Sequence, residues 1–180
     1  MKKITLFDKT FRTYIPQAEI EAAIGQIADA LNRENAHRDD IPIFLCVLHG
    51  ALLFTAELMK RLDFPCQIAS VKASSYIGTQ TTGHVGFDMG LTADVKGRRV
   101  YILEDIVDTG GTILALRDLL EAEGATEIKV CTMIFKEEAY HQDMPIDYVG
   151  IRIENKFIVG YGLDYDEIGR NLKDIYILDA

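Results

Sequence analysis

Three acidic side chains and a Thr/Gly-rich loop lie close together in residues 100–112, which read VYILEDIVDTGGT. The run begins as an apolar strand, becomes acidic where such a strand should end, and closes in a loop that opens a helix. Carboxylates accept hydrogen bonds from hydroxyl groups and can bind Mg²⁺, whereas a glycine-rich loop before a helix presents backbone N–H groups to an anion. The run therefore predicts a site for a ligand that carries both hydroxyl groups and phosphate.

Each part of this run also has a simpler interpretation when it is taken alone. Residues 109–112 could form an ordinary strand–helix turn, and Asp108 could cap the helix that follows. Glu104 and Asp105 are neighbours, so a regular strand would point them to opposite faces, and they reach one ligand only where the chain curls at the strand end. The combination is more specific than its parts, because an anion cradle directly follows three carboxylates.

The elements that must position this run alternate between apolar strands and helices. Strands are predicted at residues 41–48, 66–73, 99–106 and 127–135. Helices are predicted at residues 16–33, 51–62 and 112–123. This order predicts the α/β class, with a parallel twisted sheet, flanking helices and right-handed crossovers. Ligands bind beyond the carboxyl ends of the strands in such sheets, so the residues after each strand should line one crevice.

The remaining segments lack this alternation of strand and long helix. Residues 74–95 are rich in Gly and Thr and predict a functional lid or, in part, a hairpin outside the main sheet. Short strands that predict a small C-terminal subdomain over one end of the sheet lie at residues 147–153, 157–162 and 175–178. We therefore expect one domain over residues 1–180, with a core at about 16–135 and a hood at about 136–180 that includes the N-terminal residues.

Composition limits the classes of protein to which this chain can belong. The chain has 180 residues, 48% of them apolar, and a formal net charge of −9. This charge disfavours a nucleic-acid or anionic-membrane surface, so we expect neither as a partner. Cys46, Cys66 and Cys131 show no paired pattern and are expected to be free thiols. No apolar stretch approaches the ~20 residues that span a bilayer, and the chain starts without a signal-peptide pattern, so a cytoplasmic protein is expected.

The run at residues 100–112 strongly resembles the phosphoribosyl-pyrophosphate motif of the type I phosphoribosyltransferases. Leu48-His49-Gly50 stands where that family has its pyrophosphate loop, and Ser75-Tyr76 with the Gly-rich stretch resembles the flexible lid of the hypoxanthine–guanine subgroup. Lys136 and the sequence KFIVGYGLDY at residues 156–165 resemble that subgroup's purine-binding hood. The resemblance covers roughly residues 40–178 and implies the type I phosphoribosyltransferase fold.

The resemblance implies a role for each residue on the sugar-phosphate side of the site. Glu104 and Asp105 would hold the ribose hydroxyls, directly or through Mg²⁺, and Asp108 would be the catalytic acid/base residue near purine N7. The 5′-phosphate would be bound by Thr109, Gly110, Gly111 and Thr112. The phosphoribosyl pyrophosphate would also contact Leu48, His49, Gly50 and Arg170, and the bond between the first two of these would be a cis peptide.

On the purine side, the resemblance implies that Lys136 donates to the purine O6 and that Phe157 stacks on the base. The Ile158 backbone would read the base edge, and Asp164 would bind a second Mg²⁺ on the pyrophosphate side. Ser75 and Tyr76 would belong to a lid that closes over the site. Two positions depart from many relatives, because His49 replaces a lysine and residue 111 is glycine, which carries no side chain for a contact.

The activity implied is transfer of the 5-phosphoribosyl group from phosphoribosyl pyrophosphate to hypoxanthine and guanine, giving IMP or GMP and pyrophosphate. Mg²⁺ would be the cofactor, and the protein would be a homo-oligomer, either a dimer or a tetramer. Two alternatives stay open: a xanthine–guanine or pyrimidine phosphoribosyltransferase, and a non-catalytic regulator that binds phosphoribosyl pyrophosphate or RNA. Taken alone, Phe157 could be an ordinary core residue and Lys136 a solvated strand end. Asp164 and Arg170 could form a weak surface ion pair.

Overall fold

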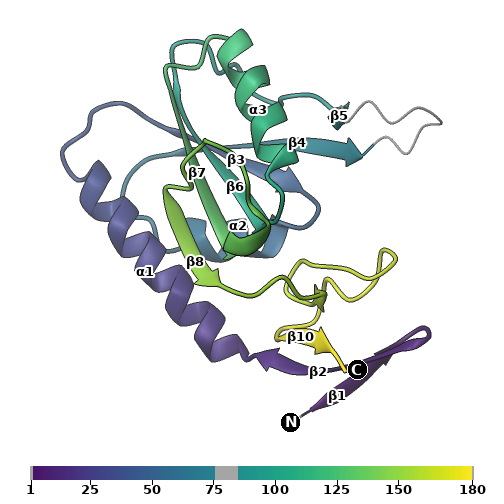
Figure 1. Ribbon diagram of the computed structural model, residues 1–180. Coiled ribbons are helices and arrows are strands. Elements are labelled where there is room, and N and C mark those ends of the chain that lie inside the picture. Colours follow the sequence, from purple (N-terminus) through teal and green to yellow (C-terminus); the bar gives the residue numbers. More distant parts are fainter. Residues whose placement is uncertain (1, 76–84, 180) are drawn as a thin grey trace.

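A computed structural model describes residues 2–75 and 85–179 and contains a six-stranded mixed sheet as its centre (Figure 1). The strand order is β5-β4-β3-β6-β7-β8. All neighbouring pairs are parallel except β4 and β5, which are antiparallel. The strands are β3 (Ile43–Leu48), β4 (Gln67–Ser75), β5 (Val85–Met89), β6 (Arg99–Val107), β7 (Glu127–Phe135) and β8 (Tyr148–Arg152).

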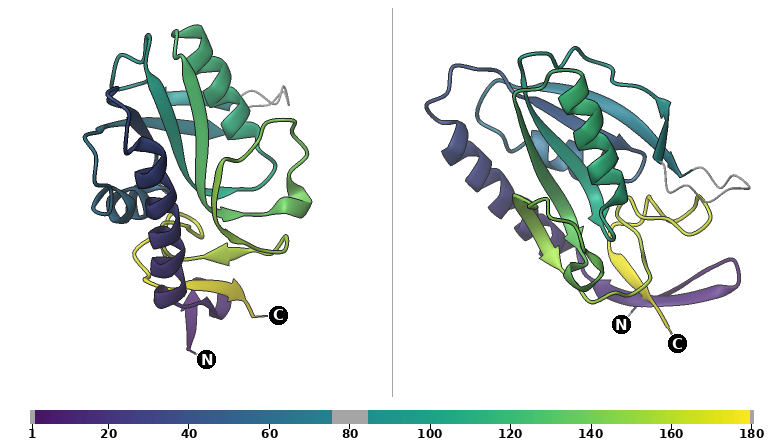
Figure 2. Two further views of the ribbon diagram at one scale, coloured as in Figure 1. Left: turned by 90° about the vertical axis from the view of Figure 1, so that its left-hand side faces the viewer. Right: turned by 45° about the horizontal axis from the view of Figure 1, so that its top comes forward.

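Helices cover both faces of this sheet, which explains why its central strands are apolar on both sides (Figure 2). Phe44 and Tyr101 point to the face covered by α1 (Gln17–Asn35) and α2 (Leu52–Met59). Their strand neighbours Ile43 and Ile102 point to the other face, where α3 (Gly111–Ala122) packs. This alternation fixes the register of β3 and β6, because a shift by one residue would exchange the two faces.

A second, small sheet lies beyond the carboxyl ends of β6 and β7 (Figure 1). Its order is β1-β2-β10-β9, and all its pairs are antiparallel. It joins the two termini through β1 (Lys3–Leu6), β2 (Lys9–Ile15), β9 (Ile158–Val159) and β10 (Ile175–Leu178). Phe11, Val159 and Tyr176 form its own buried cluster. The carboxylate of Asp174 accepts a 2.9 Å hydrogen bond from the Gln17 N–H and thereby ties this sheet to the start of α1.

The α/β prediction is confirmed, and the structure differs from the sequence expectations in three segments. β5 joins the main sheet as an antiparallel edge strand, so the hairpin expected outside that sheet is wrong for these residues. β8 pairs in parallel with β7 and therefore belongs to the main sheet, not to the small subdomain in which the sequence places residues 147–153. The chain between β7 and β8 contains only the short 3-10 helix η1 (Glu137–Ala139), so the usual helical signal of a parallel crossover is missing. The strands β1 and β2 were not predicted.

The three cysteines are free, as expected; Cys46 and Cys131 are buried. Burial raises the pKa of the Cys66 thiol, which is partly exposed. Across residues 2–75 and 85–179, no helix combines the length and the apolar character needed to cross a membrane.

Candidate active site

The loop between β6 and α3 forms the floor of a cleft of about 360 Å³. Gly110 stands at the start of α3 with φ 84°, a left-handed conformation that glycine adopts without strain. The Leu114 N–H donates to the Gly110 carbonyl at 3.0 Å, so the preceding N–H groups at the start of the helix have no helical acceptor. Together with the helix dipole, these N–H groups favour an anion in the cleft. The lining residues are Glu104 and residues 106–113.

Glu104 is buried and Asp105 partly buried at the end of β6, and their surroundings disfavour two charges. Burial is the main cause that raises the pKa of Glu104 well above its usual value, and the charge of Asp105 adds to it. Burial likewise raises the pKa of Asp105 to about 6, although a 2.9 Å hydrogen bond from the Ile106 N–H opposes this. Oε2 of Glu104 has no hydrogen-bond partner among the described residues. The pair therefore suits a ligand that brings hydroxyl donors or positive charge.

The two carboxylates have different neighbours. Glu104 lines the cleft, whereas the Asp105 carboxylate lies so close to Gly50 that a side chain there would have no room. The Gly50 carbonyl in turn leaves no room for a side chain at Gly162, which follows β9. The peptide bond between Leu48 and His49 is cis, as the resemblance implies. Gly50 thus lies between the end of β6 and the loop that joins β9 to β10.

That loop holds an ion pair beside the connection. Nη2 of Arg170 lies 2.8 Å from Oδ1 of Asp164, and Nη1 of Arg170 donates to the Gly162 carbonyl at 2.8 Å. The charge of Arg170 also lowers the pKa of Asp105, though less than burial raises it. The surface ion pair considered from the sequence is present, and it lies next to the buried acid.

Asp108 and Lys136 form an ion pair at the edge of the cleft. Nζ of Lys136 lies 2.8 Å from Oδ2 of Asp108. The lysine is buried, and its backbone N–H donates to the Val107 carbonyl at 3.0 Å. Lys136 is therefore not a solvated strand end, and it presents a proton donor beside an exposed carboxylate.

Phe157 presents an aromatic face on the small sheet. It is 46% exposed, so it is not a core residue. Its ring packs edge-on against Tyr165 at 5.8 Å and is tilted against Phe11 at 6.1 Å. The next residue, Ile158, is buried in β9. An exposed ring supported by two others is suited to stack on a flat ligand.

A family model described as the phosphoribosyl transferase domain matches residues 14–166 of this chain. The chain belongs to the phosphoribosyl transferase family. It is 37% identical to a hypoxanthine-guanine-xanthine phosphoribosyltransferase of Tritrichomonas foetus, over 99% of this chain and 97% of that one. It is 32% identical to a hypoxanthine phosphoribosyltransferase of Salmonella typhimurium, over 91% of this chain and 92% of that one. A crystal structure of a hypoxanthine phosphoribosyltransferase from Staphylococcus aureus superposes with a TM-score of 0.86 at 30% identity, over 93% and 91% of the two chains.

Two contacts join residues that the sequence singles out beyond the carboxyl ends of the strands: Asp105 lies against Gly50, and Lys136 pairs with Asp108. Tyr76 lies outside the described residues, and Ser75 is the last residue of β4. One contact was missed: Gln142, read as part of a solvated turn, donates from Nε2 to the Thr109 carbonyl at 2.9 Å. No local sequence pattern predicts this contact, because its two residues lie 33 positions apart.

Proposed function

We propose that this protein transfers the 5-phosphoribosyl group of phosphoribosyl pyrophosphate to hypoxanthine and guanine in purine salvage. The observation that carries the proposal is the pair of Asp108 and Lys136, 2.8 Å apart, at the edge of a cleft suited to phosphate. This pair supports the proposal because it can supply a donor to the base and an acid/base group beside an anion site. The names of the relatives favour this activity over a pyrimidine transferase or a non-catalytic regulator.

The sugar-phosphate half of the site would bind through charge and backbone donors. The 5′-phosphate lies on residues 109–112, where free N–H groups and the Thr109 and Thr112 hydroxyls can donate to it. The ribose hydroxyls donate to Glu104 and Asp105, and these donors would offset the cost of burial that raises the pKa values of both carboxyls. Pyrophosphate lies toward residues 48–50 and Arg170, and the Ser75-Tyr76 lid stays part of the proposal.

Mg²⁺ fits the same donor set, because buried carboxylates are hard oxygen ligands. Among the described residues no three acidic, His or Cys groups cluster closely enough to hold a metal alone, so substrate and water oxygens would complete its shell. Glu104 and Asp105 would hold one ion and Asp164 a second. When bound, Mg²⁺ supplies charge that stabilises the leaving pyrophosphate.

The chemical step forms a bond between purine N9 and the anomeric carbon and breaks the bond from that carbon to pyrophosphate, with inversion. Lys136 donates to O6 and holds Asp108 toward the base, where the carboxylate accepts the proton that N7 loses as N9 forms the new bond. Phe157 stacks on the base, and the Ile158 backbone reads its edge. Because the site is built to donate at O6, adenine, whose amino group cannot accept there, is rejected.

A turnover assay tests the proposal. Purified protein is mixed with phosphoribosyl pyrophosphate, Mg²⁺ and, in turn, hypoxanthine, guanine, xanthine, adenine or uracil, and pyrophosphate release is measured. We expect turnover with hypoxanthine and guanine and none with adenine. Absence of release with every base contradicts the proposed activity, and preference for uracil contradicts the base site. The proposal includes a homo-oligomer, a dimer or a tetramer, which sedimentation equilibrium checks; a monomer contradicts that part.

A further inference from the structure

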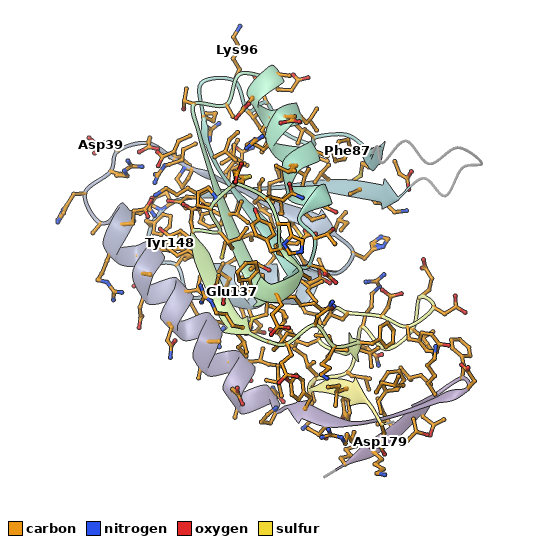
Figure 3. All side chains as sticks on the ribbon, in the orientation of Figure 1. Asp39, Phe87, Lys96, Glu137, Tyr148 and Asp179 are labelled. Atoms are coloured by element: carbon orange, nitrogen blue, oxygen red, sulfur yellow. The ribbon has the colours of Figure 1, made fainter. Side chains whose placement is uncertain are left out.

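The segment that follows β7, residues 136–144, crosses the phosphate loop, and we name it the strap. Its first residue, Lys136, holds Asp108 at 2.8 Å. Further along the strap, the side chains of Tyr140 and Gln142 both lie against Gly110. One continuous segment therefore contacts successive residues of the loop that receives the 5′-phosphate. Figure 3 labels Glu137 on this segment.

Tyr140 is the fixed part of the strap. Its hydroxyl donates to the Met144 carbonyl at 2.6 Å, and its ring packs edge-on against Phe135 at 5.4 Å. The ring lies so close to Gly110 that no side chain fits there. The strap is thus held in shape by its own hydrogen bond and held to the end of β7 by the packing of Tyr140 on Phe135, so it can act as a support for the phosphate loop.

Gln142 fixes the orientation of one peptide group of the loop. Its Nε2 donates to the Thr109 carbonyl at 2.9 Å. In a trans peptide the carbonyl and the following N–H point in opposite directions, so holding the Thr109 carbonyl toward Gln142 turns the Gly110 N–H away from the strap. Without that bond the peptide before a glycine of positive φ can rotate and turn a carbonyl oxygen toward the anion.

We propose that Gln142 is a positioning residue for 5′-phosphate binding, acting through the Thr109–Gly110 peptide. The inference rests on the proposed function in that the loop receives the phosphate of the substrate. Gln142 brings no charge and is not itself a phosphate ligand. Its effect is confined to ligands that carry the phosphate, and it leaves the affinity for the free base unchanged.

The test compares Gln142→Met, which keeps the length of the side chain but removes its donor, with Gln142→Glu, which places a carboxylate against the carbonyl. His141→Met is the matched control, because His141 is exposed and its side chain makes no hydrogen bond among the described residues. Calorimetry measures the affinity for ribose 5-phosphate, IMP and hypoxanthine, and steady-state kinetics measures KM for both substrates. Thermal melting checks that each variant is folded.

For Gln142→Met we expect about a fivefold to tenfold weaker affinity for ribose 5-phosphate and IMP and a similar rise in KM for phosphoribosyl pyrophosphate. The affinity for hypoxanthine and its KM stay as in the control, and Gln142→Glu shows a larger loss. Equal affinities in Gln142→Met and the control overturn the proposal, as does a loss that affects hypoxanthine to the same degree. Ribose 5-phosphate binding needs no turnover, so failure of the proposed activity is seen separately in the unaltered protein.

Discussion

The two ends of the six-stranded sheet both gather acidic side chains that are partly or fully buried, but their partners differ. At the carboxyl end, burial raises the pKa values of Glu104 and Asp105, and the charge of Asp105 adds to the rise at Glu104. At the amino end, Glu34 of α1 accepts hydrogen bonds from Tyr101 and Lys129, both at 2.7 Å, and from Tyr148, which Figure 3 labels beside α1. Partial burial by itself raises the pKa of Glu34, but these hydrogen bonds outweigh it and lower the pKa to about 2.

Acidic side chains therefore have opposite effects on stability at the two ends of the sheet. A carboxylate whose pKa is lowered by folding stabilises the fold at neutral pH, whereas one whose pKa is raised destabilises it. Glu34 is surrounded by donors from three strands, and both of its carboxylate oxygens already accept hydrogen bonds. Glu104 keeps an oxygen without a partner at the cleft. A ligand can donate hydrogen bonds to Glu104 at the carboxyl end, whereas Glu34 at the amino end already has its donors. The amino end therefore contributes stability, and the carboxyl end contributes ligand binding.

Asp108→Asn is the largest expected effect, and it tests whether a paired acid at the carboxyl end is functional. We expect kcat to fall by about 10²-fold to 10⁴-fold, because the amide cannot exchange a proton. The amide oxygen still accepts from Lys136, so the fold and the affinity for ribose 5-phosphate are kept. Steady-state kinetics measures kcat, and calorimetry measures the affinity for ribose 5-phosphate. The control is Asp118→Asn, at an exposed position on α3. Unchanged kcat would remove Asp108 from the acid/base role.

Glu104→Gln should change stability and substrate binding in opposite directions: the folded state becomes more stable, and the substrate binds more weakly. Removing a buried charge that lacks a partner is expected to raise the free energy of unfolding by about 1 kcal/mol. The same change weakens the hydrogen bonds to the ribose, so kcat/KM for phosphoribosyl pyrophosphate falls by about tenfold or more. Urea unfolding and kinetics provide the measurements, with Glu121→Gln on α3 as the exposed control. A less stable variant would mean that Glu104 supports the fold, as Glu34 does.

Glu34→Gln should show the opposite pattern. At pH 7 we expect the free energy of unfolding to fall by about 2 kcal/mol, because the pKa of Glu34 is lowered from 4.5 to about 2 by folding. That stabilisation is fully present above the unfolded pKa of 4.5 and is lost as pH falls through 4.5 toward 2. The kinetic constants stay unchanged.

Urea unfolding at several pH values between 7 and 2 measures this effect. The difference between the unaltered protein and Glu34→Gln should shrink through the acid window and be smallest near pH 2. Glu19→Gln, on the exposed first turn of the same helix, is the control and should change stability by less than about 0.5 kcal/mol. A difference independent of pH would show that the ionised form of Glu34 is not what stabilises the amino end.

The carboxyl end could be predicted from the sequence because its information is local. An apolar run that becomes acidic and closes in glycines places Glu104, Asp108 and the phosphate loop within nine consecutive residues. Strand-end geometry then brings Lys136 to the same edge, since β6 and β7 are parallel neighbours. Phe157 needed the family resemblance, because an aromatic residue in an apolar strand is usually buried.

The amino end could not be predicted, because its contacts join distant parts of the chain. Glu34 meets its partners at separations of 67, 95 and 114 residues, on three different strands. The membership of β8 in the main sheet, which brings Tyr148 to Glu34, depends on pairing with β7 rather than on a local helical signal. The contact between Gln142 and Thr109 escaped for the same reason.

Arg38→Gln should have the smallest effect on stability. It tests whether exposed ion pairs at the amino end stabilise the fold as the partly buried hydrogen bonds of Glu34 do. Nη1 of Arg38 lies 3.1 Å from Oε2 of Glu127, but the two side chains are 39% and 37% exposed. Water and salt screen such a pair, so we expect a fall in the free energy of unfolding that is much smaller than for Glu34→Gln and that disappears in about 1 M salt. Urea unfolding at low and high salt measures it beside Glu34→Gln. A loss as large as that of Glu34→Gln would show that the exposed rim contributes as much as the buried hydrogen bonds, and burial would then no longer explain why the two ends differ.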